Sequence, residues 1–165
     1  MSSLTILGIL PLLGSAALFL LPRERELLAK QVALGLSSVV AVAGVAMALS
    51  FDRGVTGFQF IEKYSWIPAF GITFGLGVDG MALLLILLAL ILTPIVILAC
   101  WHEAEGGRWS VKTFFALLLI LETMMIGVFA ATDIFLFYLF FEAMLIPVYF
   151  LIGGYGTGER AAAAV

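Results

Sequence analysis

One stretch decides the fold of this chain: Asp133-Ile-Phe-Leu-Phe-Tyr-Leu-Phe-Phe-Glu142-Ala-Met-Leu-Ile-Pro147-Val-Tyr-Phe-Leu-Ile-Gly153. From Ile134 to Ile152, every side chain is apolar or aromatic except those of Glu142 and Pro147. At about 1.5 Å per residue, a helix of this length crosses a hydrocarbon layer about 30 Å thick, and its acid lies roughly 12 Å from its start. The stretch therefore predicts a membrane-spanning helix with a carboxylate at mid-depth.

The carboxylate of Glu142 is the first candidate functional group. Inserting a carboxylate at mid-membrane costs about 3 kcal/mol, so we expect it to face protein or water, in a setting that favours its protonated form. Pro147 lacks an N–H and leaves the carbonyl of Ala143 without its helical partner, which favours a helix kink or a bound water. We interpret Glu142 as a proton-relay residue. The alternative is a glutamate that only hydrogen-bonds a neighbouring helix.

The composition indicates a polytopic membrane protein. Hydrophobic residues make up 64% of the 165 residues, charged residues make up 12%, and the mean hydropathy is +1.22. Soluble globular domains are far more polar than this. The single cysteine, Cys100, excludes an internal disulfide and any multi-cysteine metal or iron–sulfur site. The sequence shows no basic stripe of the kind that binds nucleic acid, so no nucleic-acid partner is expected.

Long apolar runs predict five membrane spans, at about 4–21, 30–51, 81–100, 113–131 and 134–153. Residues Glu159 to Val165 look like the start of a sixth helix. The expected fold class is therefore all-α: a polytopic transmembrane bundle forming one membrane domain, 1–165, with five spans and a truncated helix from residue 159.

The basic residues predict an orientation with the N-terminus outside. In that orientation six Lys and Arg side chains lie on the inner side and two on the outer side. The inner set is Arg23, Arg25, Lys30, Arg108, Lys112 and Arg160, and the outer set is Arg53 and Lys63. Because basic residues are enriched in cytoplasmic loops, this distribution favours N-outside and an external segment 52–80.

The segment 52–80 contains two short β-favouring runs, around residues 58–61 and 72–74, which predict a small interfacial hairpin. The run Gly75-Leu-Gly-Val-Asp-Gly80 formally matches the G-x-G-x-x-G dinucleotide fingerprint. We reject that reading, because a membrane-spanning helix follows and position 100 is a cysteine instead of an acid. We interpret Asp79 as the N-cap of the third span and the glycines as sites of close packing.

Two further patterns are interpreted as structural. His102 is the single histidine, so it lacks a partner at metal spacing, and we expect a solvated loop residue and no metal site. The glycine-rich run 153–158 lacks the Lys-Ser/Thr ending of a phosphate-binding loop. We interpret it as a helix stop followed by a flexible turn.

A second acid, Glu122, lies in the fourth span, nine residues before Ala131, while Glu142 lies eight residues after Ile134. Because the turn at Thr132 is short, the two helices must be antiparallel neighbours, and both acids then lie at nearly the same depth. Two close acids would oppose each other's ionisation. The sequence leaves open whether they face each other, and whether Glu122 makes a structural hydrogen bond or is a second proton-relay residue.

The chain resembles the subunit M family of respiratory NADH-quinone oxidoreductases (complex I), which is related to mitochondrial subunit 4. The resemblance covers essentially all of the sequence. It is carried by Trp66-Ile-Pro68, by Leu76-Gly-Val-Asp-Gly80 before a long apolar span, and by Phe140-Phe-Glu142-Ala-Met-Leu-Ile-Pro147 with Gly153 closing the helix.

The resemblance implies an antiporter-like, proton-pumping subunit in a bacterial inner membrane, without a redox centre of its own. FMN, iron–sulfur clusters and quinone are then expected on other subunits, and the partners are other membrane-arm subunits and the lipid bilayer. Glu142 matches the family's fifth-helix glutamate, which pairs with a lysine on a later helix. The family has about fourteen spans in inverted repeats, so we expect this chain to be a fragment or truncated product that ends before those lysines.

Two other function classes remain open. One is a subunit of a multisubunit cation/proton antiporter, because such subunits share the general plan of the family. The other is a truncated structural or assembly piece of a membrane complex, in which Glu142 only hydrogen-bonds its neighbours.

Overall fold

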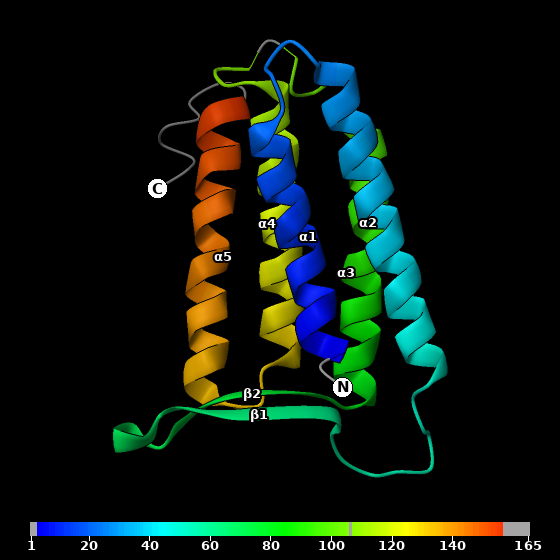
Figure 1. Ribbon diagram of the computed structural model, residues 1–165, viewed down its shortest axis with the longest axis vertical. Coiled ribbons are helices and arrows are strands. Elements are labelled where there is room, and N and C mark those ends of the chain that lie inside the picture. Colours follow the sequence, from blue (N-terminus) through cyan, green and yellow to red (C-terminus); the bar gives the residue numbers. More distant parts are fainter. Residues whose placement is uncertain (1–2, 106, 157–165) are drawn as a thin grey trace.

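The computed structural model describes residues 3–105 and 107–156, which form five long helices and one β-hairpin (Figure 1). The elements are α1 (Ser3–Leu20), α2 (Glu26–Leu49), β1 (Gln59–Ile67), β2 (Ile72–Val78), α3 (Gly80–Ala99), α4 (Val111–Ala130) and α5 (Ile134–Tyr155), with a short 3₁₀ turn, Pro68–Phe70, between the strands. The helices share one long axis, and the hairpin lies across one end of the bundle, where α1, α3 and α5 begin.

All five helices are long and apolar enough to cross a membrane, which confirms the five predicted spans. The boundaries differ by a few residues. The largest shift is at α2, which begins at Glu26 because its charged first turn is helical although it is not apolar. The all-α prediction holds for the spans, but the described fold also contains a two-stranded antiparallel sheet. The predicted helix from residue 159 lies outside the described residues.

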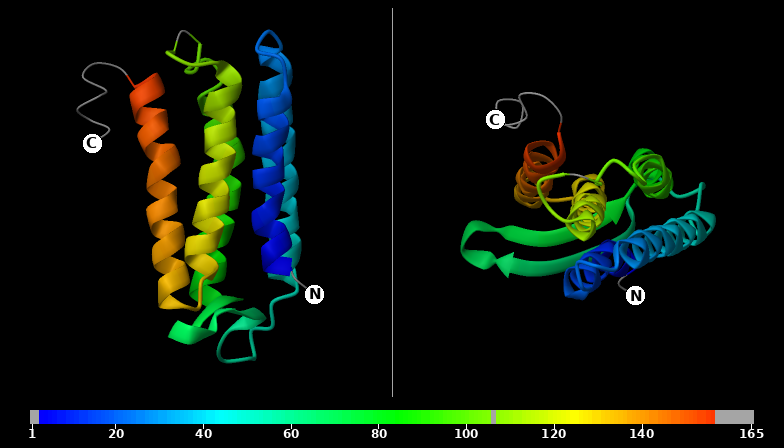
Figure 2. Two further views of the ribbon diagram at one scale, coloured as in Figure 1. Left: turned by 60° about the vertical axis from the view of Figure 1, so that its left-hand side comes forward. Right: turned by 90° about the horizontal axis from the view of Figure 1, so that it is seen from above.

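Helix α4 lies at the centre of the bundle and packs against α1, α2, α3 and α5 (Figure 2). Seen along the helix axes, α5 and α3 lie on either side of α4, and α1 and α2 lie along one flank. Within its apolar span, 56% of the residues of α4 are buried, compared with 11% for α5. Helix α5 therefore leaves most of its surface open among the described residues.

The interior contains two hydrophobic clusters, and α4 contributes to both. The hairpin-end cluster includes Leu4, Val40, Ile86, Leu90, Ile126 and Leu136. The loop-end cluster includes Leu18, Ala33, Ile97, Phe115 and Leu119. Because Leu119 belongs to one cluster and Ile126 to the other, the two turns of α4 between them join the two halves of the core.

The hairpin supplies a carboxylate to the beginning of α1. Glu62, on β1, is only 6% exposed, and its Oε1 accepts a hydrogen bond of 2.8 Å from the backbone N–H of Leu4. The backbone N–H and the hydroxyl of Thr5 also donate to this carboxylate. A register shift just before Glu62, where Phe60 has a φ of 52°, marks a bulge of the kind that re-aims a side chain. Glu62 thus caps a helix that has no acidic residue in its first turn.

Aspartates cap the other two helices that begin at the hairpin. The carboxylate of Asp79 accepts from the N–H of Ala82 at 2.7 Å, which confirms the predicted N-cap of α3. Asp133 caps α5 by accepting from the N–H of Phe135 at 2.9 Å. Its other oxygen accepts from the backbone N–H of Thr73, on β2, at 3.2 Å. The hairpin and the first turn of α5 are therefore held by the same carboxylate.

The glycines of β2 allow the strand to approach the α4–α5 turn closely. A Cβ at Gly75 would lie 2.6 Å from the hydroxyl oxygen of Thr132, and one at Gly77 would lie 3.1 Å from its methyl carbon. The backbone N–H of Thr132 donates to the carbonyl of Gly75 at 2.9 Å. These contacts confirm Gly75 and Gly77 as close-packing positions, whereas a Cβ at Gly80 would have no neighbouring atom within 4 Å.

The helix stop predicted in the run 153–158 is confirmed, because α5 ends at Tyr155 with Gly156 as its C-cap, two residues past Gly153. Gly154 is buried in the helix, and a Cβ there would lie 2.5 Å from the ring of Trp109. The backbone N–H of Arg108 also donates to the carbonyl of Gly154 at 3.0 Å. Gly154 therefore allows α5 to pack closely against the loop between α3 and α4.

We expect Glu62→Ala to lower the stability of the protein by about 1 kcal/mol, the usual cost of losing a helix N-cap. The neighbouring residue Lys63 is exposed, so Lys63→Ala is the matched control. The measurement is thermal unfolding of the purified full-length protein in detergent. Equal midpoints for the two variants would contradict the capping role.

We also expect Asp133 to make stability depend on acid pH. The N–H of Thr73, followed by those of Phe135 and Leu136, holds the pKa of Asp133 below its usual value. Because the unfolded chain has a pKa of about 3.9, this contribution is complete above about pH 4. It is lost as the pH falls through the lower pKa of the folded state.

Unfolding midpoints measured from pH 6 down to pH 2 test this expectation. Asp133→Asn should lower stability at pH 6 and flatten the acid limb of the profile. Asp52→Asn changes an exposed loop aspartate and should leave the limb unchanged. An identical acid limb in Asp133→Asn and the wild type would show that this cap does not contribute.

Candidate functional site

Glu142 lies in the middle of α5 and is exposed on a face that no other described element covers. Helix α5 packs against α4 and β2, and the side of the helix that carries Glu142 points away from both. One turn earlier, the hydroxyl of Tyr138 lies beside the Glu142 carboxylate, and the Tyr138 side chain is also exposed. The described residues thus present an acid and a phenol together on the open face of α5.

Pro147 lies on the opposite side of α5, where it is buried against the bundle. The helix continues through it to Tyr155. Because proline has no N–H, the carbonyl of Ala143 has no helical partner, and this carbonyl follows Glu142 directly in the sequence. The predicted weak point of the backbone is therefore next to the candidate acid.

Glu122 lies in α4 and is fully buried, with 0% exposure. Within the part of the chain that the structure describes, neither of its carboxylate oxygens has a hydrogen-bond partner. It lies between Leu119 and Ile126 on α4, so it separates the loop-end cluster from the hairpin-end cluster. A buried polar side chain without a partner is rare and calls for a specific explanation.

The two acids do not face each other. Glu122 lies in the core, whereas Glu142 is on the open side of α5. Their helices are adjacent, since a Cβ at Gly127 would lie 2.5 Å from the ring of Phe140. The structure therefore brings the helices together as predicted and places their carboxyl groups in different surroundings.

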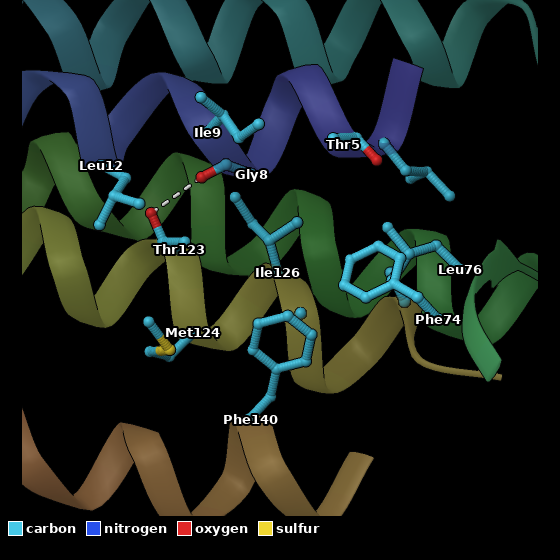
Figure 3. A pocket seen from close by; sticks show the side chains of 13 residues that line it. Thr5, Gly8, Ile9, Leu12, Phe74, Leu76, Thr123, Met124, Ile126 and Phe140 are labelled. Carbon is cyan, nitrogen blue, oxygen red and sulfur yellow. Dashed lines mark hydrogen bonds between the residues drawn. The ribbon is translucent and has the colours of Figure 1, made fainter. Parts of the chain in front are cut away.

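A cavity of about 210 Å³ lies between α1, α4, α5 and β2, close to the hairpin (Figure 3). Its walls include Ile126 and Phe140, and nearly all of its lining is apolar. The two hydroxyl groups on it are already used: Thr5 donates to Glu62, and Thr123 donates to the carbonyl of Gly8 at 2.9 Å. The cavity suits a hydrocarbon group better than an ion.

Sequence reasoning missed a charged cluster at the other end of the bundle. Lys30 is 4% exposed, and its ammonium nitrogen lies 2.5 Å from Oε1 of Glu105. His102 also contacts Glu105, with 2.9 Å between Nδ1 and Oε1, and is otherwise exposed as predicted. The hydrogen bond from Lys30 lowers the pKa of Glu105 below its usual value. The available signal was a lysine close to the start of an apolar helix, which we used only for orientation.

The described residues contain no group of three or more His, Cys, Asp or Glu side chains that could hold a metal ion. Cys100 is a free, partly buried thiol at the end of α3. The candidate functional groups are therefore the two membrane acids, which could exchange protons, and the backbone beside Pro147.

Comparison with known proteins agrees with this picture. A profile of the family described as "NADH:quinone oxidoreductase/Mrp antiporter, TM" matches residues 131–165. This region includes the α5 helix with Glu142 and Pro147.

Similar curated proteins are NADH-quinone oxidoreductase subunit M of Mycobacterium tuberculosis strain H37Rv and NADH-ubiquinone oxidoreductase chain 4 of Arabidopsis thaliana. The first is 39% identical over 98% of this chain and 34% of its own length, and the second is 37% identical over 91% and 30%. The chain thus spans about a third of the length of the curated relatives it matches.

A structure of respiratory complex I from Thermus thermophilus with bound NADH contains a chain that superposes with a TM-score of 0.79. That match has 26% sequence identity and covers 98% of this chain and 31% of the other. Over nearly its whole length, the chain is therefore similar to part of the subunit M and chain 4 proteins of NADH-quinone oxidoreductases.

Proposed function

We propose that this chain is part of an antiporter-like membrane subunit of a proton-translocating NADH-quinone oxidoreductase, in which Glu142 takes up and releases protons at mid-membrane. The observation that carries the proposal is the position of Glu142, at the centre of a helix long enough to span the membrane and on a face that the described residues leave open. An acid at this depth is expensive to leave in lipid and is functional in most membrane proteins that have one.

The open face of α5 indicates where the rest of the site comes from. Only 11% of the residues in its apolar span are buried by the described residues. The curated relatives are about three times as long as this chain, so they contain further chain that can cover this face. By resemblance to the family, we propose that a lysine on a later helix pairs with Glu142.

Such a pair would work by electrostatics. When the ammonium group moves towards the carboxylate, the charged forms of both groups are stabilised. When it moves away, the carboxylate binds a proton more readily and the ammonium group releases one more readily. Each tenfold change in proton affinity corresponds to about 1.4 kcal/mol. Redox reactions elsewhere in the assembly would drive the separation. Tyr138 lies beside Glu142 and can hold its carboxylate by a hydrogen bond while the pair is open.

The chain's own residues take no part in electron transfer in this proposal. FMN, iron–sulfur clusters and quinone would be bound by other subunits. The partners would be the other membrane-arm subunits and the lipid of a bacterial inner membrane. We further propose that the N-terminus is outside, with the hairpin on the outer surface and the Lys30–Glu105 pair on the inner surface.

A second candidate function is a subunit of a multisubunit cation/proton antiporter. The description of the matching profile, which names the Mrp antiporter beside the oxidoreductase, favours keeping it. The two functions share the same use of Glu142 and differ in what drives the transport. Sodium-dependent proton movement in vesicles, without NADH, would favour the antiporter.

We expect Glu142→Gln in the full-length protein to reduce proton pumping at least tenfold relative to NADH oxidation, because the amide cannot carry a proton. The measurement is proton uptake into inverted membrane vesicles driven by NADH. Glu24→Gln changes an exposed loop glutamate and is the matched control. A normal ratio of protons to electrons in Glu142→Gln would rule out the relay, and failure of the variant to assemble would be recognised by blue-native electrophoresis.

The orientation has a separate test by thiol labelling. In a Cys100→Ser background, Lys63→Cys and Arg23→Cys place a thiol at opposite ends of the bundle, both at exposed positions. A membrane-impermeant maleimide added to intact spheroplasts should label Lys63→Cys and not Arg23→Cys. The reverse pattern would invert the proposed topology.

A further inference from the structure

The surroundings of Glu122 can be located from packing contacts between three helices. A Cβ at Gly14, on α1, would lie 2.9 Å from Leu36, on α2, and 3.1 Å from Leu119, on α4. These three residues therefore share one level of the bundle. Ser37 follows Leu36 on α2 and is 0% exposed. Glu122 lies one turn beyond Leu119, and a helical side chain leans towards its helix N-terminus, which brings its carboxyl group towards the same level.

Among the buried hydroxyl groups of the core, those of Ser37, Thr93 and Thr123 donate to backbone carbonyls. Ser37 donates to the carbonyl of Leu34 at 3.1 Å, and Thr93, on α3, donates to that of Ala89 at 2.9 Å. Thr123, next to Glu122, donates to Gly8 as described above. These groups keep only lone pairs for a further partner. A carboxylate can only accept hydrogen bonds, whereas a neutral carboxylic acid also has an O–H to donate. As possible partners, these three hydroxyl groups therefore suit the protonated form of Glu122.

No cation among the described helices balances a charge at Glu122. Helices α1 and α3 contain no charged residue, and the only charged residue within α5 is Glu142 on its open face. On α2, Glu26 is exposed in the first turn, and Lys30 is seven residues before Ser37 and pairs with Glu105. On α4, Lys112 donates to the carbonyls of Phe19 and Leu21 at the loop end. An ionised Glu122 would be desolvated without a counter-charge.

We propose that Glu122, Ser37 and one internal water form a proton-binding site between α2 and α4, whose resting state is the neutral acid. Buried polar groups without a protein partner commonly bind an internal water, which can accept from the acid O–H and donate to the Ser37 oxygen. Loading transfers a proton from a hydronium ion, through this water, to the carboxylate, and unloading reverses the transfer. The role of this stored proton in transport rests on the proposed function, but the existence of the site does not.

Infrared spectroscopy of the full-length protein in its native complex can test the site without enzymatic turnover. At pH 7 the wild type should show the C=O stretching band of a neutral carboxylic acid that is absent from Glu122→Gln. Any band from Glu142 remains in both spectra and cancels in their difference. The band should shift to lower frequency within minutes in D₂O, because the internal water allows exchange. Absence of the difference band at pH 7, or a band that never shifts in D₂O, would overturn the proposal.

Two serines next to each other provide a matched control for the site. Ser37 and Ser38 both donate to the carbonyl of Leu34, at 3.1 Å and 2.7 Å, but only Ser37 is fully buried. Ser37→Ala should raise the frequency of the Glu122 band by removing the acceptor of the bridging water, and Ser38→Ala should leave it unchanged. The same response in both variants would count against the assigned partner.

Glu122→Asp covers the case in which Glu122→Gln does not assemble, because the shorter acid should keep a neutral band at a changed frequency. If that variant has the wild-type band, the band does not belong to Glu122 and the proposal fails. The spectra are recorded at rest, so a negative pumping result for Glu142→Gln would remove the proposed function and leave these observations standing.

Discussion

The packing of α4 in the centre of the bundle is the constraint on which the rest of the structure depends. Because α4 touches four other helices, one side of it is buried between Leu119 and Ile126. A polar residue on this buried side must be accommodated inside the protein, and Glu122 is such a residue. The same packing uses one side of α5 and leaves the other side open, so that Glu142 is placed at a surface. One central helix thus determines the surroundings of both acids.

The hairpin contributes to this arrangement by holding helix ends. Three of the helices begin beside it, and each beginning is capped by a carboxylate, from Glu62, Asp79 or Asp133. A carboxylate near a helix N-terminus interacts favourably with the exposed N–H groups and with the helix dipole. Because Glu62 and Asp133 also connect the helices to the strands, the hairpin limits how far α1 and α5 can move relative to each other at this end.

Much of the fold follows from local sequence patterns, and much of the site does not. Long apolar runs predicted the spans, alternation predicted the hairpin, and Asp79 before an apolar run predicted an N-cap. The cap from Glu62 joins residues 58 positions apart, and the pair of Lys30 with Glu105 joins residues 75 apart, so no local pattern contains them. The close approach of Gly154 to the ring of Trp109 also joins residues far apart in the sequence. The side of α4 that Glu122 occupies depends on all four neighbouring helices.

The different surroundings of the two acids give them different requirements for a partner. Glu122 is buried without a counter-charge, and the hydroxyl groups of Ser37, Thr93 and Thr123 already donate to carbonyls, so these surroundings favour the neutral acid. Glu142 has an open face and a neighbouring phenol, so it can be approached by a cation or water from outside the described helices. At similar depth in the membrane, one acid is suited to hold a proton and the other to exchange its partner. That difference follows from burial alone, since both residues are glutamates on adjacent, equally apolar helices.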